Sequence, residues 1–354
     1  DIGAEVSSLM ELELALDLGA PEIIFNGPGK SNKALKKAIE ARDKVKICID
    51  SFSELERISK ISEKNIKVSA RLNLNSKFSK WNKFGFTPGN LSSKLGKFEE
   101  EGIELRGLNF HTGSEKSFSS FRKRIKRIKK FIEKISPEKR KKLEFIDIGG
   151  GFGVRGYRKV SSVEALINLS DFEFPFINKI LEPFRKEKGI GIKEIAEIVF
   201  ESINDNIMKL KGIEDLRIFI EPGRWISNPC FDVIAEAIDV KSSGIILDAN
   251  TSFLPHLFFE EHPVYNLSNS GNEKMRGKVY GNLCKAGDIL SRSYRGGKAE
   301  KGDLFCIKNI GAYSISESKD FIGARPCVVS YNGDRLKIVR KKEEIADRTE
   351  RDIY

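Results

Sequence analysis

The first two-thirds of the chain alternate short apolar runs with longer segments whose apolar residues recur at helical spacing. About seven runs have the length and apolar content of buried strands, at 2–6, 22–26, 45–50, 66–74, 105–110, 145–148 and 218–221. Helical patterns cover 8–18, 31–41, 54–61, 90–101, 122–142 and 192–210. Because strands that alternate with helices pair in parallel, this pattern predicts an α/β fold with a parallel sheet.

The number of strands bears on whether that sheet closes. A (β/α)8 TIM barrel needs eight strands, one more than the runs found here. An opened barrel leaves strand edges unpaired in its core, which is costly. We therefore expect either an open sheet or a first barrel strand that lies upstream of Asp1.

Beyond residue 227 the helical periodicity fades. Short β-rich runs follow at 231–240, 244–247, 278–280, 304–307, 327–331 and 336–339, separated by Gly, Asn and Asp. We predict a barrel domain over 1–227 and a C-terminal antiparallel β domain over 228–354. The long connection 153–212 is interpreted as a lid or a dimer element.

The amino-acid composition limits the classes of protein to which the chain can belong. The chain has 354 residues, of which 40% are hydrophobic and 32% charged, as in soluble globular proteins. The five Cys form no CxxC pair, which favours reduced thiols and a cytoplasmic location. Three His argue against a His-built metal site. No apolar run is long enough to span a bilayer, so no membrane partner is expected.

The net charge of +11 is compatible with nucleic acid or with an anionic ligand. The densest basic segment, 122–142, carries Ile125, Ile128, Phe131 and Ile132 at helical spacing. This pattern favours the solvated face of an amphipathic helix. No basic motif with interleaved aromatic residues supports nucleic-acid binding, which is the weaker alternative.

Several predicted strands end in polar residues that suit an aromatic, phosphorylated ligand. Glu221-Pro222-Gly223-Arg224 follows a strand, where a Glu can bond a protonated ring nitrogen and an Arg can grip a phosphate. His111 also ends a strand and can stack on a ring. Each motif also fits an ordinary turn or a hydrogen-bonded His, so neither is specific alone.

A glycine run, Gly149-Gly150-Gly151, completes the set. Consecutive exposed N–H groups form an anion-binding nest, although glycines also make plain turns. A ring-stacking His, a ring-nitrogen carboxylate and several phosphate-binding elements together describe pyridoxal phosphate well.

The order of these motifs resembles the fold-type III pyridoxal-phosphate decarboxylases, the group of diaminopimelate, ornithine and carboxynorspermidine decarboxylases on the alanine-racemase-type barrel. The similarity spans nearly the whole chain. The motifs that carry it are Glu5 to Leu12, Gly27-Pro28-Gly29-Lys30, Asp50-Ser51, Arg71-Leu72-Asn73, His111-Thr112-Gly113-Ser114, Gly149-Gly150-Gly151-Phe152, Glu221-Pro222-Gly223-Arg224, Cys284-Lys285-Ala286-Gly287-Asp288 and Gly311-Ala312-Tyr313.

The resemblance implies a role for each matching residue. His111 is expected to stack on the pyridine ring, and Glu221 to pair with its nitrogen, with Arg71 at the other edge of the ring. Cys284 is expected to come from the partner subunit of a homodimer with shared active sites and to protonate the α-carbon after carbon dioxide leaves. The phosphate ligands implied are Ser114, Gly150, Gly151, Gly223, Arg224 and Tyr313.

Two features depart from the family pattern. The family's Schiff-base lysine lies about fifteen to twenty residues before the position of Glu5, hence upstream of Asp1, and no Lys in this chain has its setting. Lys30 matches a different family segment. We expect that the lysine precedes the given sequence; the alternative is a non-catalytic homologue that binds pyridoxal phosphate.

The second departure concerns the substrate. The family usually has Glu or Asp after the Cys, facing the substrate's distal ammonium, whereas this chain has Lys285. The segment 248–256 also lacks the Arg that diaminopimelate enzymes use. We predict that Lys285, with Asp288 and His256, contacts a substrate with a distal acidic group, as in the carboxynorspermidine or siderophore-precursor branches. The alternative is a solvated Lys.

The sequence thus predicts decarboxylation of an amino acid on pyridoxal 5'-phosphate, in the manner of diaminopimelate decarboxylase. A racemase on the same barrel is the second possibility. The Cys284 loop and the Gly-Ala-Tyr segment favour the decarboxylase.

Overall fold

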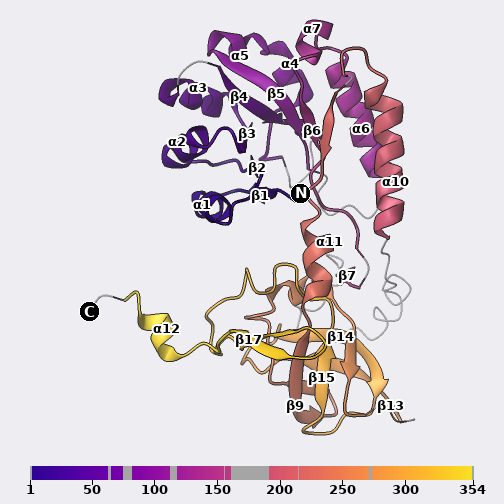
Figure 1. Ribbon diagram of the computed structural model, residues 1–354. Coiled ribbons are helices and arrows are strands. Elements are labelled where there is room, and N and C mark those ends of the chain that lie inside the picture. Colours follow the sequence, from indigo (N-terminus) through magenta and orange to yellow (C-terminus); the bar gives the residue numbers. More distant parts are fainter. Residues whose placement is uncertain are drawn as a thin grey trace. The chain divides into compact units, whose positions relative to one another are not determined.

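The computed structural model describes residues 2–62, 65–74, 82–111, 118–154, 156–160, 191–213, 215–269, 271 and 273–352. The chain divides into two compact units, each described here by itself (Figure 1). The first comprises Asp1–Gly153 and Ile190–Pro222, and the second comprises Val154–Gly189 and Gly223–Tyr354.

The first unit is built on a seven-stranded parallel sheet in which each strand pairs with the next one along the chain. The strands are β1 (Ala4–Val6), β2 (Ile23–Phe25), β3 (Val45–Ile49), β4 (Ile66–Arg71), β5 (Ile103–Asn109), β6 (Phe145–Asp147) and β8 (Arg217–Phe219). Their order runs from β1 to β8, so the sheet is a curled, barrel-type sheet with two edges. The predicted α/β class and the seven strands are confirmed.

Helices fill the crossovers of this sheet. They are α1 (Leu9–Asp17), α2 (Asn32–Glu40), α3 (Phe52–Ile61), α4 (Pro88–Ser93), α5 (Gly96–Glu100), α6 (Phe118–Ile132), α7 (Pro137–Arg140) and α10 (Ile192–Ile203), which continues into the π-helical turn η2 (Asn204–Met208). Hydroxyl caps begin five of them: Ser8, Ser31, Ser51, Thr87 and Ser136 accept from the backbone N–H three residues on.

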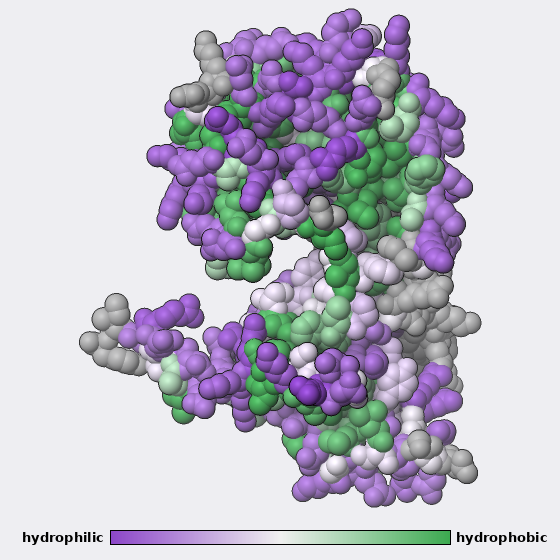
Figure 2. Space-filling view, viewed as in Figure 1, coloured by the Kyte–Doolittle hydropathy of each residue, from purple (hydrophilic) through white to green (hydrophobic). Residues whose placement is uncertain are grey.

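Helix α6 carries the basic segment. Its apolar residues Ile125, Ile128, Phe131 and Ile132 are all at most 1% exposed. Hydrophilic side chains cover most of the visible face of the first unit (Figure 2). The basic residues of α6 therefore belong to the outer side of an amphipathic helix, as its periodicity predicted.

The second unit has a six-stranded sheet in the order β12-β15-β9-β10-β13-β14. Its strands are β9 (Val233–Lys241), β10 (Gly244–Leu247), β12 (Val264–Asn266), β13 (Lys274–Tyr280), β14 (Ile289–Gly297) and β15 (Leu304–Ile307). All these pairs are antiparallel except β10 with β13, so the sheet is mixed rather than purely antiparallel. The core includes Ala237, Ile245, Leu247, Val279, Leu290, Phe305 and Ile307.

Smaller elements complete this unit. Two further antiparallel strand pairs join β7 (Arg158–Lys159) to β11 (Glu260–Glu261) and β16 (Val328–Tyr331) to β17 (Leu336–Arg340). The helices are α11 (Gly223–Ser227), η3 (Asn228–Cys230), η4 (Pro255–Phe258) and α12 (Ile345–Thr349). Across the described part of the chain, no helix combines the length and the apolar character of a membrane span.

Candidate active site

Glu221 lies directly after β8, and the backbone holds it beside the glycine run. Its N–H donates to the carbonyl of Gly149 at 3.0 Å, which extends the parallel pairing of β6 and β8 by one step. Its side chain accepts a hydrogen bond of 2.7 Å from Asn26 Nδ2. Backbone and side chain of Glu221 are therefore both fixed at the carboxyl ends of the strands, where enzymes of this sheet class carry their chemistry.

A cluster of acidic groups surrounds the Glu221 carboxyl. Asp147 at the end of β6 is fully buried, and Glu5 on β1 lies nearby. Burial and then repulsion from Asp147 and Glu5 raise the pKa of Glu221 to about 10. Burial also raises the pKa of Asp147 and of Glu5. The cluster therefore holds a proton at neutral pH, and a basic ring nitrogen can share it.

Arg71 supplies positive charge to this cluster. Its guanidinium attracts all three carboxyls, which limits the rise in their pKa values. The guanidinium lies 4.6 Å from the centre of the Phe84 ring. Arg71 is thus held at the end of β4 on the same side of the sheet as the acids.

Only glycine fits the run after β6. Gly149 and Gly151 have φ of +67° and +82°, which side chains other than glycine rarely adopt. A Cβ on Gly150 would lie 2.1 Å from the carbonyl oxygen of Glu221 and 3.5 Å from Nε2 of His111. The glycines therefore leave bare backbone between Glu221 and His111.

His111 is half-buried and uncharged at neutral pH. Burial, followed by repulsion from Arg71 and Arg124, lowers its pKa to about 4. A neutral imidazole next to the glycine run is suited to stacking on an aromatic ring. Ser114, predicted three residues further on, lies outside the described residues.

A second cluster, in the second unit, is centred on Arg224. Its guanidinium forms a two-point ion pair with Glu260, NH1 to Oε2 at 2.9 Å and NH2 to Oε1 at 2.8 Å. It also lies over two rings, 4.6 Å from the centre of Tyr157 and 5.0 Å from that of Tyr313. His256 also stacks on Tyr313, with the ring centres 4.8 Å apart. The structure therefore gives Arg224 a carboxylate partner that the sequence prediction did not include.

Three further observations concern predicted residues of the second unit. Tyr313 has φ of +64°, a conformation found at strained, functional positions. A Cβ on Gly223 would meet nothing within 4 Å, so close packing does not explain this glycine. Cys284 is exposed, with a free thiol.

The loop that carries Cys284 and Lys285 is fixed by Asp288. The Asp288 carboxylate is buried; Oδ1 accepts from N and Oγ1 of Thr251, both at 2.8 Å, and Oδ2 accepts from Leu283 N at 2.8 Å. Its oxygens are thus committed to the loop. Asp288 holds the loop in place rather than facing a ligand.

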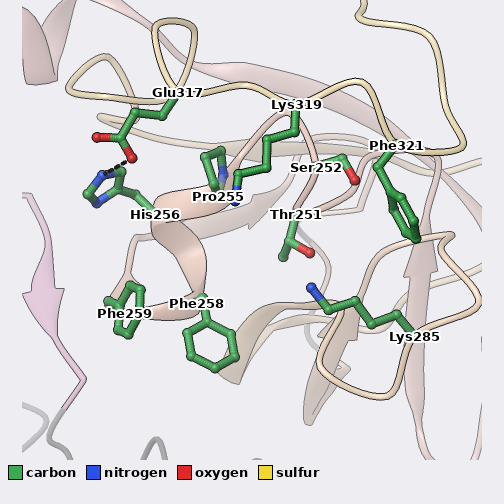
Figure 3. Close-up of a pocket in the computed structure, with 10 residues that line it drawn as sticks. All are labelled: Thr251, Ser252, Pro255, His256, Phe258, Phe259, Lys285, Glu317, Lys319 and Phe321. Carbon is green, nitrogen blue, oxygen red and sulfur yellow. Dashed lines mark hydrogen bonds and ion pairs between the residues drawn. The ribbon is translucent and has the colours of Figure 1, made fainter.

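Lys285 and His256 line one pocket of the second unit (Figure 3). His256 Nε2 lies 3.1 Å from Glu317 Oε2. Lys285 forms no ion pair with any carboxylate in the described ranges. Of the residues predicted for the substrate, the structure brings these two to a common cavity.

The predicted site residues fall into two groups. His111, Arg71, Glu221 and the glycine run converge in the first unit. Gly223, Arg224, Tyr313, His256, Cys284, Lys285 and Asp288 belong to the second. Sequence reasoning missed Asn26, Asp147, Glu260 and Tyr157. Asp147 gave the clearest available signal, since an acid ends a strand immediately before three glycines.

The first group can be tested against the chemistry of a pyridine cofactor. It offers a proton-bearing carboxyl cluster for a ring nitrogen, a neutral imidazole for a ring face, and backbone free of Cβ atoms between the two. Asp147 Oδ2 and Asn26 Oδ1 are buried without a hydrogen-bond partner among the described residues. Residues and fold together define a barrel-type protein that is suited to a pyridoxal-type cofactor.

Comparisons with known proteins identify the family. The family described as "Pyridoxal-dependent decarboxylase, pyridoxal binding domain" matches residues 2–228. The family described as "Pyridoxal-dependent decarboxylase, C-terminal sheet domain" matches residues 177–311. The chain belongs to the pyridoxal-dependent decarboxylases. Its cofactor is pyridoxal 5'-phosphate, and its reaction is the decarboxylation of an amino acid.

Individual relatives agree with this assignment. The diaminopimelate decarboxylase of Archaeoglobus fulgidus is 27% identical, over 99% of this chain and 81% of the relative. That of Methanocaldococcus jannaschii is 25% identical, over 99% of this chain and 78% of the relative. The solved diaminopimelate decarboxylase from Helicobacter pylori, in complex with L-lysine, has a TM-score of 0.76 at 20% identity and covers 98% of this chain and 83% of its own. The last likeness supports the fold.

Proposed function

We propose that the chain decarboxylates an amino acid whose side chain ends in an acidic group, and that Glu221 is the residue that holds the ring nitrogen of the cofactor. The proton-bearing cluster of Glu221, Asp147 and Glu5 is the observation that supports the role of Glu221 at the ring nitrogen. A carboxyl with a pKa near 10 has a proton to share with the ring nitrogen at neutral pH.

The remaining cofactor contacts are those that the resemblance to the pyridoxal-dependent decarboxylases implies. His111 covers one face of the ring as a neutral imidazole, and Arg71 balances the acids. Backbone N–H groups of Gly150, Gly151 and Gly223 receive the phosphate, together with Ser114, Arg224 and the Tyr313 hydroxyl. The ion pair with Glu260 occupies two N–H groups of Arg224, and a guanidinium has five.

Bound pyridoxal phosphate supplies an aromatic ring that accepts the electron pair released when carbon dioxide leaves. Glu221 would hold a proton at the ring nitrogen, and His111 would stack on the face of the ring. Cys284 from the partner subunit of a homodimer donates the proton that the α-carbon then needs. Asp288 sets the position of Cys284 through the bonds that fix its loop.

The positive charge of Lys285 supports a substrate whose side chain ends in an acidic group. Relatives named diaminopimelate decarboxylase act on a substrate that carries both an amine and a carboxylate at its distal end. An exposed ammonium at Lys285 repels an amine and attracts a carboxylate. We therefore propose a distal carboxylate, of diaminopimelate, carboxynorspermidine or siderophore-precursor type.

Carbon dioxide release from a panel of distal-acidic and distal-amino substrates tests the proposal. Lys285→Glu should reduce kcat/KM for distal-acidic substrates about tenfold or more and should improve distal-amino ones. An unchanged preference rejects the role of Lys285. Chiral analysis in the same assay tests the racemase alternative, which the comparisons do not support, and absence of both reactions in the natural protein would favour the non-catalytic homologue.

The proposal also includes the oligomeric state, the location and the domain boundaries of the chain. The chain works as a homodimer in the cytoplasm. Its domains are 1–227 and 228–354, with the pyridoxal-binding part first. The match of the C-terminal sheet family over residues 177–311 supports a second domain of decarboxylase type.

A further inference from the structure

A pocket of about 530 Å3 lies within the second unit, next to the turn at 250–254 and to η4. Three kinds of group line it: aromatic rings, hydroxyls and charged side chains (Figure 3). The lining residues are Thr251, Ser252, Pro255, His256, Phe258, Phe259, Lys285, Glu317, Lys319 and Phe321. Of these, Lys319 has no role in the function proposed above.

Two ammonium groups enter this pocket from different segments. Lys285 comes from the loop between β13 and β14, and Lys319 from the segment after Tyr313. Figure 3 shows both side chains extended into the cavity, on either side of Thr251. Throughout the described residues, neither ammonium has a carboxylate within ion-pair distance.

The charges of the pocket do not balance. Glu317 is the carboxylate among the lining residues that the structure describes, and its Oε2 is engaged by His256 Nε2 at 3.1 Å. Two positive charges therefore face a cavity whose carboxylate already has a partner. Complementarity favours an anionic ligand that meets both ammonium groups.

Hydrogen bonds anchor the two segments that carry Lys285 and Lys319. The N–H of Lys319 donates to the carbonyl of Ser252 at 2.8 Å. On the other side, Asp288 ties the Lys285 loop to Thr251 at 2.8 Å. Because both segments are anchored to adjacent residues of one turn, the fold brings the backbones of Lys285 and Lys319 to the same pocket.

We infer that Lys285 and Lys319 form a two-cation clamp for a substrate side chain that ends in two carboxylates. Phe258 and Phe321 give the pocket apolar walls for the methylene chain that precedes them. The inference rests on the proposed function in naming the ligand a substrate, and it adds Lys319 as a residue that determines specificity.

Binding of simple carboxylates to the natural protein tests the clamp without any reaction. Isothermal titration with butyrate and with the dicarboxylates from succinate to pimelate measures the preference for two charges. We expect at least one dicarboxylate to bind about tenfold more tightly than butyrate, since each charged hydrogen bond contributes on that order. Lys319→Gln should reduce that ratio to near one, and Lys319→Arg should keep most of it.

Lys301→Gln is the matched control, because Lys301 is an exposed lysine of the same unit outside the pocket. Equal losses in Lys301→Gln and Lys319→Gln, or no preference for dicarboxylates in the natural protein, overturn the clamp. If carbon dioxide release succeeds while that preference is absent, only the clamp fails. If the preference depends on Lys319 but no amino acid is decarboxylated, the clamp stands and the proposed reaction fails.

Discussion

At the scale of single residues, the Glu221 carboxyl affects both the pH dependence of folding stability and the binding of the cofactor. In the folded chain it keeps its proton up to a pKa of about 10, whereas its ordinary pKa is 4.5. Between these values the folded state binds more protons than the unfolded state. The stability of the cofactor-free protein therefore falls as pH rises through this window, and the contribution is fully present only below pH 4.5.

Glu221→Gln removes this titration while keeping the shape of the side chain. We expect the free energy of unfolding of the cofactor-free variant at pH 8 to exceed that of the natural protein by about 1 kcal/mol or more, with a much smaller difference at pH 5. Affinity for pyridoxal phosphate should fall. Urea unfolding at both pH values and a cofactor titration measure the two effects; lower stability of the variant at pH 8 would contradict the assignment.

Lys30 shows how a buried lysine can be structural. Its Nζ lies 3.0 Å from Glu54 Oε1 and donates to the carbonyls of Gly27 at 2.8 Å and Cys48 at 2.7 Å. An ammonium has three donors, and all three are used. This agrees with the sequence interpretation that Lys30 is not the lysine that binds the cofactor.

Lys30→Met should destabilise the protein by about 3–5 kcal/mol, because it leaves the buried Glu54 carboxylate without its ion-pair partner and removes the bonds to the carbonyls of Gly27 and Cys48. Lys46→Met is the control: Lys46 pairs with Glu22 at 2.7 Å, but its side chain is 26% exposed. That change should cost about 1 kcal/mol or less. Chemical denaturation compares them, and similar losses in both variants would refute the buried network.

Strand ends let the sequence predict part of the site. His111, Glu221 and the glycine run each follow an apolar run, so their meeting follows from parallel pairing. Asn26 and Glu260 also follow apolar runs, but their roles depend on partners far along the chain that the sequence does not show. Asn26 meets Glu221, 195 residues away, and Glu260 meets Arg224, 36 residues away.

At the scale of elements, local signals predicted helices and strands of the first unit well. Serine caps marked helix starts, and apolar runs marked strands. Strand β14 was missed because its middle residues, Ser291, Arg292 and Ser293, are polar. Glu261 accepts bonds from both serine hydroxyls and from the Arg292 N–H, at 2.8–3.0 Å. The sequence cannot show that a distant carboxylate satisfies these polar groups.

The loop 281–288 depends on one carboxylate. Asp288→Ala leaves the buried N–H groups of Thr251 and Leu283 without acceptors. We expect a loss of about 2–4 kcal/mol in unfolding free energy and faster hydrogen exchange at Leu283. Asp334→Ala, at an exposed position of the β16–β17 turn, should change neither. Unaltered exchange at Leu283 would show that Asp288 does not hold the loop.

At the scale of the whole molecule, the residues proposed for one cofactor divide between the two units. Glu221 and His111 belong to the first, whereas Arg224, Tyr313 and Cys284 belong to the second. Neither composition nor charge indicated that the proposed cofactor residues divide between two units. In the proposed homodimer, Cys284 serves the site of the partner subunit.

That organisation can be tested by mixing inactive variants. If Glu221 and Cys284 of one site come from different subunits, a heterodimer of Glu221→Gln and Cys284→Ser has one site with both residues intact. Random pairing of equal amounts makes about half of the dimers mixed, so about a quarter of the sites should regain activity. Carbon dioxide release should be near zero for each variant alone and should recover after the two are unfolded and refolded together.

The same mixture has a built-in control. Combining Glu221→Gln with His111→Ala places both changes in the first unit, so no pairing of subunits restores a complete site. This mixture should stay inactive. Recovery there would mean that Glu221 and His111 of one site come from different subunits. No recovery with Cys284→Ser would mean that each site is built within one chain. In that case the proton donor lies in the same subunit as Glu221, and catalysis would not require a homodimer.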